Sequence, residues 1–242
     1  MANYFYCEVL KTKRSFTQKL LWIAPLATML LAFLMGGTYN LQPMSFYWWY
    51  AFVLCGFIAI LCGLSIQREQ RAGKFYSIYS SPIMLTEFWK SKVVAVSVFV
   101  VGASLLLAWL MILTILFESV PHVISTFRML LGAIGVAVSS LWQIPLCLWL
   151  ANKAGMFLPL LVNAIAGLFS TFITNTAYWW VVPYTWTAKI MEPLTGIKSS
   201  GEMGIVADYN TALIPIIFCL SVALFLVLTV ITSKWFASQE VK

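Results

Sequence analysis

The sequence predicts an all-α integral membrane protein with six transmembrane helices. Its composition carries this prediction: 62% of the residues are apolar, only 10% are charged, and the mean hydropathy is +0.90. A soluble domain has about 25% charged residues, so most of this chain is expected to face lipid. One domain, 1–242, is predicted, with spans at about 20–36, 46–66, 93–117, 129–151, 156–176 and 212–232.

The residues that flank the first two apolar runs support their assignment as spans. A charged segment, 1–19, precedes the first apolar run, a pattern that also suits a cleavable signal peptide. We retain 20–36 as a span, because the Lys and Arg pattern of the later loops alternates correctly only with it. The second span opens with four aromatic residues, 47–50, which we expect to mark the outer membrane boundary.

A basic interval at 68–92 fixes the predicted topology. It holds five of the fifteen Lys and Arg residues of the chain and separates the second and third spans. Lys and Arg collect in cytoplasmic loops, so this interval is expected to face the cytoplasm. With six spans, twelve basic residues fall on the cytoplasmic side and three outside. Both termini are therefore predicted to be cytoplasmic, and the net charge of +7 is assigned to the membrane surface rather than to nucleic acid.

The predicted spans lack ionisable side chains near their middles. Ion-coupled transporters and intramembrane hydrolases usually need such groups at depth, so neither class is expected. The lone histidine, His122, lies in an outer loop without a Cys or carboxylate cluster, which gives no metal site. The five cysteines form no Cys-x-x-Cys pair and are interpreted as apolar filler.

Mild polar residues lie inside the fourth and fifth spans. Gln143 stands beside Pro145, and Asn163 lies near Pro159. The simpler interpretation is hydrogen bonding between helices, worth about 0.6 kcal/mol for each bond. The alternative is a hinge or substrate path at Gln143, Pro145 and Asn163, because proline weakens a helix locally.

The basic interval contains a short amphipathic segment. Phe75, Ile78 and Tyr79 follow the i, i+3, i+4 spacing of one helical face, and Pro82 ends the segment. On physical grounds alone, the segment could anchor the loop at the membrane surface or dock a soluble partner.

A family resemblance favours docking. The run EQRAGKFYSIYSSPI from Glu69 resembles the cytoplasmic-loop signature of type-2 ABC exporter membrane subunits, with matching residues at Glu69, Gly73, Ile78, Ser80, Pro82 and Lys92. Lys74 departs from the Thr that many members have there. The resemblance implies a coupling helix that enters a groove on a separate ATPase. The predicted coupling residues are Glu69, Gly73, Phe75, Ile78, Ser80 and Pro82.

A narrower resemblance points to the membrane subunits of lantibiotic-immunity exporters. It rests on the chain length, the AFLMGG end of the first span, the YWW start of the second and a Trp- and Pro-rich outer segment. It implies a bacterial cytoplasmic membrane permease that expels a cationic antimicrobial peptide. The implied partners are an ATP-binding subunit dimer and a second permease half, identical or related.

The outer segment, about 177–211, offers a candidate surface for such a peptide. An aromatic and mildly acidic surface suits an amphipathic cationic peptide. The candidate residues are Trp179, Trp180, Pro183, Tyr184, Trp186 and Glu192. The alternative, which we favour, is a re-entrant or interface helix that plugs the outer end.

The chain is not expected to be an enzyme. It has no Gly-rich phosphate loop ending in Gly-Lys-Ser/Thr, so ATP and magnesium are expected on the partner ATPase and no cofactor on this chain. The alternative function is a non-transporting scaffold or sensor that docks a cytoplasmic partner through 68–92. Stimulation of ATP hydrolysis by substrate separates the two.

Overall fold

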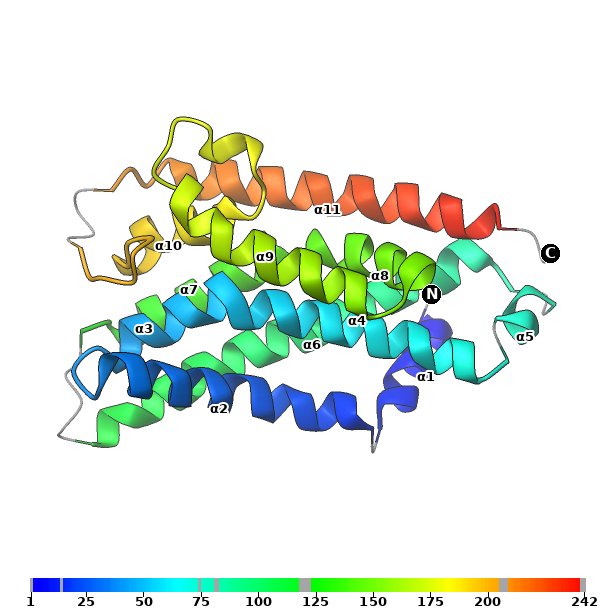
Figure 1. Ribbon diagram of the computed structural model, residues 1–242, viewed down its shortest axis with the longest axis horizontal. Coiled ribbons are helices and arrows are strands. Elements are labelled where there is room, and N and C mark those ends of the chain that lie inside the picture. The colour runs from blue at the N-terminus through cyan, green and yellow to red at the C-terminus, as the bar shows by residue number, and fades with distance from the viewer. Residues whose placement is uncertain are drawn as a thin grey trace.

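The chain folds into a bundle of long helices in a computed structural model (Figure 1). The structure describes residues 2–13, 15–73, 75–80, 83–117, 123–204 and 209–239. The all-α class is confirmed, since the described residues contain no β-strand, only an isolated bridge between Ile197 and Met203. The helices are α1 (Ala2–Thr12), α2 (Phe16–Gly36), α3 (Leu41–Trp48), η1 (Trp49–Val53), α4 (Leu54–Arg71), α5 (Tyr76–Tyr79), α6 (Leu85–Leu113), η2 (Thr114–Leu116), α7 (Thr126–Ser140), α8 (Gln143–Ala154), α9 (Phe157–Ile173), η3 (Trp179–Val181), α10 (Thr185–Thr195) and α11 (Leu213–Ala237).

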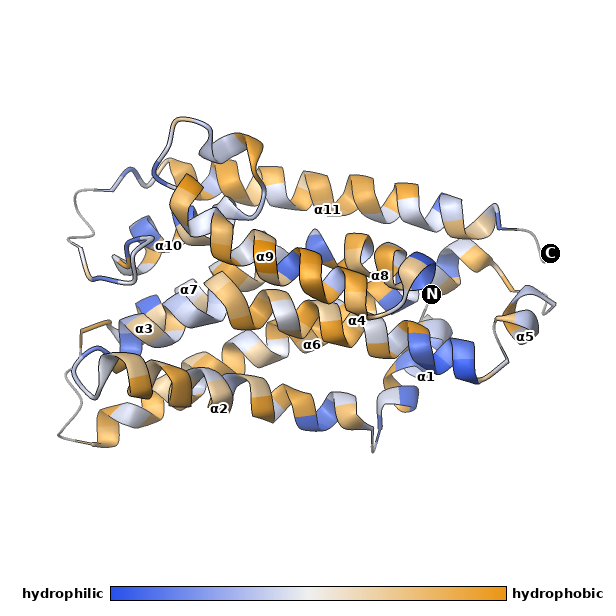
Figure 2. Cartoon of the chain, in the orientation of Figure 1, coloured by the Kyte–Doolittle hydropathy of each residue, from blue (hydrophilic) through white to orange (hydrophobic). Residues whose placement is uncertain are grey.

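The long helices run along one axis, and the polar residues gather toward the ends of the bundle (Figure 2). Helix α1, helix α5 and the last turns of α11 lie at one end, called here the charged end. Helices α3 and α10 lie at the opposite end (Figure 1). The apolar middle is the part of the bundle that can face lipid.

Four helical stretches are long and apolar enough to cross a membrane: Phe16–Gly36, Leu41–Arg71, Leu85–Leu116 and Leu213–Ala237. Helices α7 and α8 meet at an angle of 44° and give a fifth candidate if they form one span. The fifth predicted span, 156–176, coincides with α9, whose 17 residues are fewer than the roughly 20 needed. The structure thus gives four or five candidate spans, and six stays a prediction.

The second span begins earlier than predicted. Its helix starts at Leu41 and continues through the π-helical turn η1, where Trp49 and Tyr50 are buried. The Trp49 indole nitrogen donates a hydrogen bond to Ser104 of α6 over 3.2 Å. These two rings therefore pack inside the bundle, and the position of the outer membrane boundary at 47–50 stays a prediction.

Candidate functional site

Four charged side chains from three helices meet at the charged end of the bundle. The Glu69 carboxylate of α4 accepts hydrogen bonds through one oxygen, Oε1, from Lys11 of α1 at 2.7 Å and Lys92 of α6 at 2.8 Å. The Glu8 carboxylate accepts one bond from each lysine, both at 2.8 Å. The result is a closed ring of alternating charges, called here the charge ring: Glu8, Lys11, Glu69 and Lys92.

Three of the four residues of the charge ring have buried side chains. Lys92 is 1% exposed, and Glu8 and Glu69 are nearly as buried. A buried charge is costly unless it is paired, and here two positive charges face two negative ones. The Phe88 ring adds a cation–π contact, with its centroid 4.9 Å from the Lys92 nitrogen. The ring therefore fixes α1, α4 and α6 relative to one another.

Lys11 closes the ring from the solvent side. Burial by itself lowers the pKa of Lys11, but its hydrogen bonds to Glu69 and Glu8 outweigh this and raise the pKa above its ordinary value. Lys11 therefore stays charged throughout the physiological pH range. Glu8 and Lys11 stand three residues apart on α1, which places both on one helical face.

The loop signature contains half of this site, Glu69 and Lys92. Glu8 and Lys11 belong to the charged segment 1–19, to which the sequence gives no role beyond topology. The available signal was the i, i+3 spacing of Glu8 and Lys11 on a short helix before the first span. Their partners lie more than 50 residues away, and sequence spacing does not predict such a contact.

The loop that follows Glu69 contains two residues with unusual backbone geometry. Gly73 has φ +118°, a conformation that side-chain-bearing residues rarely adopt, and a Cβ built there would meet no atom within 4 Å. Glycine is thus required for its backbone freedom and not for space. Phe75, with φ 66°, precedes the single-turn helix α5, which is shorter than the predicted amphipathic helix.

The predicted apolar stripe of the loop faces its own protein. Phe75 and Ile78 are buried, and Tyr79 is partly buried. The Phe75 and Tyr79 rings lie 5.7 Å and 5.6 Å from the ring of Phe236 near the end of α11. In this chain by itself Phe75 and Ile78 therefore fill an aromatic cluster at the charged end, and their role in coupling to an ATPase stays a prediction.

Other loop residues point outward. Tyr76 is 55% exposed, and Gly73 and Ser80 are also exposed. Pro82, the remaining predicted coupling residue, lies outside the described residues, as does Lys74. The face available to a partner is called here the loop face and consists of Gly73, Tyr76 and Ser80.

The outer segment folds largely into the bundle. In α10 ten of eleven residues are buried, including Trp186 and Glu192. The Glu192 carboxylate pairs with Lys189 at 2.8 Å. Trp179, Pro183 and Tyr184 are partly buried, and Trp180 is 60% exposed. The six candidate residues thus do not form one open platform.

The predicted hinge residues surround the bend between α7 and α8. Gln143 and Pro145 occupy the first turn of α8, where a missing backbone donor costs least. Asn163 of α9 donates hydrogen bonds to the Cys55 carbonyl at 3.2 Å and to the Cys147 sulfur at 2.9 Å. It accepts a third bond from the Tyr184 hydroxyl at 2.5 Å. Asn163 therefore joins α9 to α4, to α8 and to the outer segment, and movement at the bend stays a prediction.

Metal-ligating side chains do not assemble into a site in the described part of the chain, where no group of three His, Cys, Asp or Glu lies together. His122 falls outside the described residues.

Comparison with protein families assigns the chain. The model of the family described as "ABC-2 family transporter protein" matches residues 4–171, more than half of the sequence. The chain belongs to the ABC-2 transporter family. All four members of the charge ring and the whole basic loop lie inside the matched range, whereas the outer segment and α11 lie beyond it. Searches of curated proteins and of solved structures found no match.

Membership in the ABC-2 family makes this chain a multi-pass membrane protein and a transport subunit. It also implies an ATP-binding subunit as its partner in the transporter. The family match thus covers the region that contains the charge ring and ends before the residues predicted to contact substrate.

Proposed function

We propose that this chain is the permease subunit of an ATP-driven exporter, with ATP and magnesium bound by a separate dimer of ATP-binding subunits. A second permease half, identical or related, completes the membrane part. The observation that carries the proposal is the ABC-2 family match over residues 4–171, which contains the basic loop and the charge ring. The loop face is the docking site of the ATPase in this proposal.

The charge ring supports a role in force transmission. It clamps the end of α4 to the start of α6, which are the two ends of the loop. The packing of Phe75 on Phe236 attaches the same loop to α11. A displacement of the loop by the ATPase therefore moves the ends of three helices together, because densely packed contacts transmit strain.

The proposed topology has six spans and cytoplasmic termini in a bacterial cytoplasmic membrane. The bias of twelve basic residues against three supports this orientation. The charged end then faces the cytoplasm, and α3 and α10 face outward. The bent pair α7–α8 and the short helix α9 supply the fourth and fifth spans.

The proposed substrate is a lantibiotic or similar cationic antimicrobial peptide, expelled from the membrane to protect the cell. The sequence resemblance to lantibiotic-immunity permeases supports it. Burial of Trp186 and Glu192 restricts direct contact to exposed residues such as Trp180.

The test is growth at increasing lantibiotic concentration of cells with the transporter. Protection should fall with Trp180→Ala and persist with Tyr39→Ala, a control whose ring is 75% exposed; equal protection by both variants would argue against this contact.

The coupling proposal is tested by co-purification of the tagged chain with the ATPase encoded beside it. Tyr76→Asp places a charge on the loop face and should abolish retention of the ATPase. Tyr39→Asp, which changes an exposed tyrosine on the turn between α2 and α3, is the matched control and should retain it. Failure of the wild type to retain any ATPase, or equal retention by both variants, would favour the scaffold function.

A further inference from the structure

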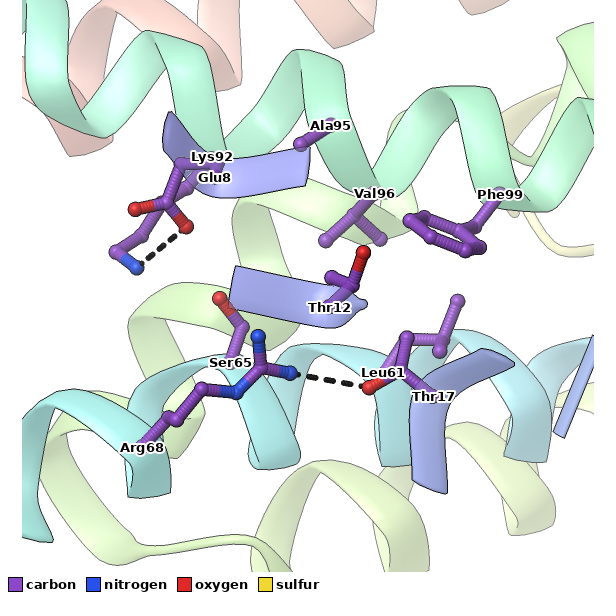
Figure 3. A pocket seen from close by; sticks show the side chains of 10 residues that line it. All are labelled: Glu8, Thr12, Thr17, Leu61, Ser65, Arg68, Lys92, Ala95, Val96 and Phe99. Carbon is purple, nitrogen blue, oxygen red and sulfur yellow. Dashed lines mark hydrogen bonds and ion pairs between the residues drawn. The ribbon is translucent and has the colours of Figure 1, made fainter. Parts of the chain in front are cut away.

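A cavity lies beside the charge ring, between the start of α2 and the end of α4. It has a volume of about 160 Å³, is partly open to the surface, and is lined by Ser15, Phe16, Thr17, Leu64, Gln67, Arg68 and Arg71. Each enclosed water requires roughly 10–15 Å³, so the space accommodates a group larger than one water. A smaller cavity of about 20 Å³ shares Thr17 and Arg68 with it and reaches Glu8 and Lys92 (Figure 3).

Two arginines give this cavity its charge. The Arg68 guanidinium extends from α4 to α2 and donates a hydrogen bond to the Thr17 hydroxyl at 3.0 Å (Figure 3). Arg71, one turn further along α4, makes no ion pair or hydrogen bond with any residue the structure describes. Both guanidinium groups thus retain donors for a ligand.

The neighbouring acids do not neutralise these arginines. Glu69 lies between them in sequence, but Lys11 and Lys92 occupy its carboxylate, and the same two lysines hold Glu8. The charge ring is therefore neutral by itself, and the cavity beside it keeps two positive charges. An anion is the ligand that this arrangement favours.

The walls of the cavity indicate the kind of anion. Guanidinium groups bind phosphate through paired N–H donors, and the first turn of α2, from Phe16, adds backbone N–H groups without a side-chain cap. Phe16, which is 54% exposed, and Leu64 give the same cavity an apolar side between two candidate transmembrane helices. Basic pockets between transmembrane helices at the cytoplasmic surface suit lipid head groups.

We propose that this cavity binds the phosphate head group of an anionic phospholipid. The phosphate lies against Arg68 and Arg71, and the acyl chains extend along Phe16 and Leu64 into the bilayer. The bound lipid bridges α2 and α4 next to the charge ring. This site does not depend on the transported substrate, but its position at the cytoplasmic surface rests on the proposed topology.

The test measures lipid binding to the purified full-length protein in a neutral detergent. Phosphatidylglycerol, phosphatidylcholine and inorganic phosphate are each titrated, with bound lipid counted by native mass spectrometry and the melting temperature recorded in parallel. Phosphatidylglycerol is expected to bind and to raise the melting temperature, whereas the other two probes are not. Arg71→Gln should weaken phosphatidylglycerol binding about fivefold, since each basic residue near an anionic lipid contributes a factor of that order.

Lys234→Gln is the matched control, because Lys234 is exposed near the same end of the bundle and lies away from the cavity. It should leave phosphatidylglycerol binding unchanged. If both variants weakened phosphatidylglycerol binding equally, the effect would be one of surface charge alone, and the proposed site would be wrong. Equal binding of phosphatidylcholine would remove the anion preference, and an equal effect of inorganic phosphate would assign the cavity to free phosphate. Arg71→Gln removes no hydrogen bond or ion pair among the described residues, so the variant is expected to fold.

Discussion

The Lys92 ammonium lies 2.8 Å from the Glu69 carboxylate, and both groups are buried where α4 and α6 meet. The two residues are the ends of the basic loop, 23 positions apart in sequence. Glu69 was predicted to contact an ATPase, but its carboxylate faces inward and is held by lysines. Its contribution to coupling would therefore be exerted through the position of the helices and not by direct contact with a partner.

Replacement of Lys92 by Met should be strongly destabilising. It leaves two buried carboxylates with Lys11 as their remaining lysine partner, and the loss of one partner from a buried ion pair costs about 3–5 kcal/mol. Unfolding by SDS in mixed micelles measures the change. Lys90→Met is the control, since Lys90 and Glu87 form a partly exposed pair whose loss should cost less than about 1 kcal/mol. Equal stability of the two variants would contradict the role of the charge ring.

A double-mutant cycle should show coupling between Glu69 and Lys92. The Glu69→Gln and Lys92→Met changes together should cost less than the sum of the single changes, because the double variant removes an opposite pair instead of isolating one charge. Residues in one ion-pair network commonly show interaction energies of about 0.5–3 kcal/mol. The cycle is measured by the same SDS unfolding assay, and additive single effects would show that the two residues act independently.

Phe236→Ala should loosen the basic loop. Phe236 is fully buried and stacks on Trp89 at a centroid distance of 4.7 Å while contacting the ring of Phe75. Truncation of a buried Phe costs about 3–5 kcal/mol. Limited trypsin digestion of the protein in membranes should cleave more rapidly within 68–92.

The control for this variant is Phe169→Ala on α9, whose ring is 62% exposed. Its digestion pattern should match the wild type. If Phe236→Ala also left cleavage within 68–92 unchanged, the loop would be held by contacts other than the aromatic cluster.

Tyr184→Phe should destabilise the outer segment. It removes the hydrogen bond to the Asn163 Oδ1 atom and leaves that buried acceptor without this donor, at a cost of about 1–3 kcal/mol. Hydrogen–deuterium exchange should increase in the outer segment around 177–184. Tyr178→Phe, which alters an exposed tyrosine in the same segment, should leave exchange unchanged. Similar exchange in both variants would show that the hydrogen bond between Tyr184 and Asn163 does not stabilise the outer segment.

Composition and charge pattern were sufficient for the class of the protein and for the position of its basic loop. The hydropathy of a segment indicates whether it can face lipid, and its Lys and Arg content indicates whether it is expected to stay in the cytoplasm. Both properties can be read from one segment without knowledge of its neighbours in the fold. The sequence also marked Pro145, next to which α7 and α8 meet at an angle, because proline acts on its own helix; a hinge there stays a prediction.

Tertiary packing alone decided which residues meet. The sequence marked Glu69 and Lys92 but not their partners on α1, and it placed Phe75 on an apolar stripe without indicating that the ring packs on Phe236. It also offered Trp186 as part of either an aromatic binding surface or a helix that plugs the outer end, and the burial of Trp186 in α10 followed only from the packing. An amphipathic or aromatic pattern states that a side chain can be buried, but the neighbour that covers it comes from another part of the chain. Local sequence determined the helices of this transporter subunit, and the packing of those helices determined its charge ring.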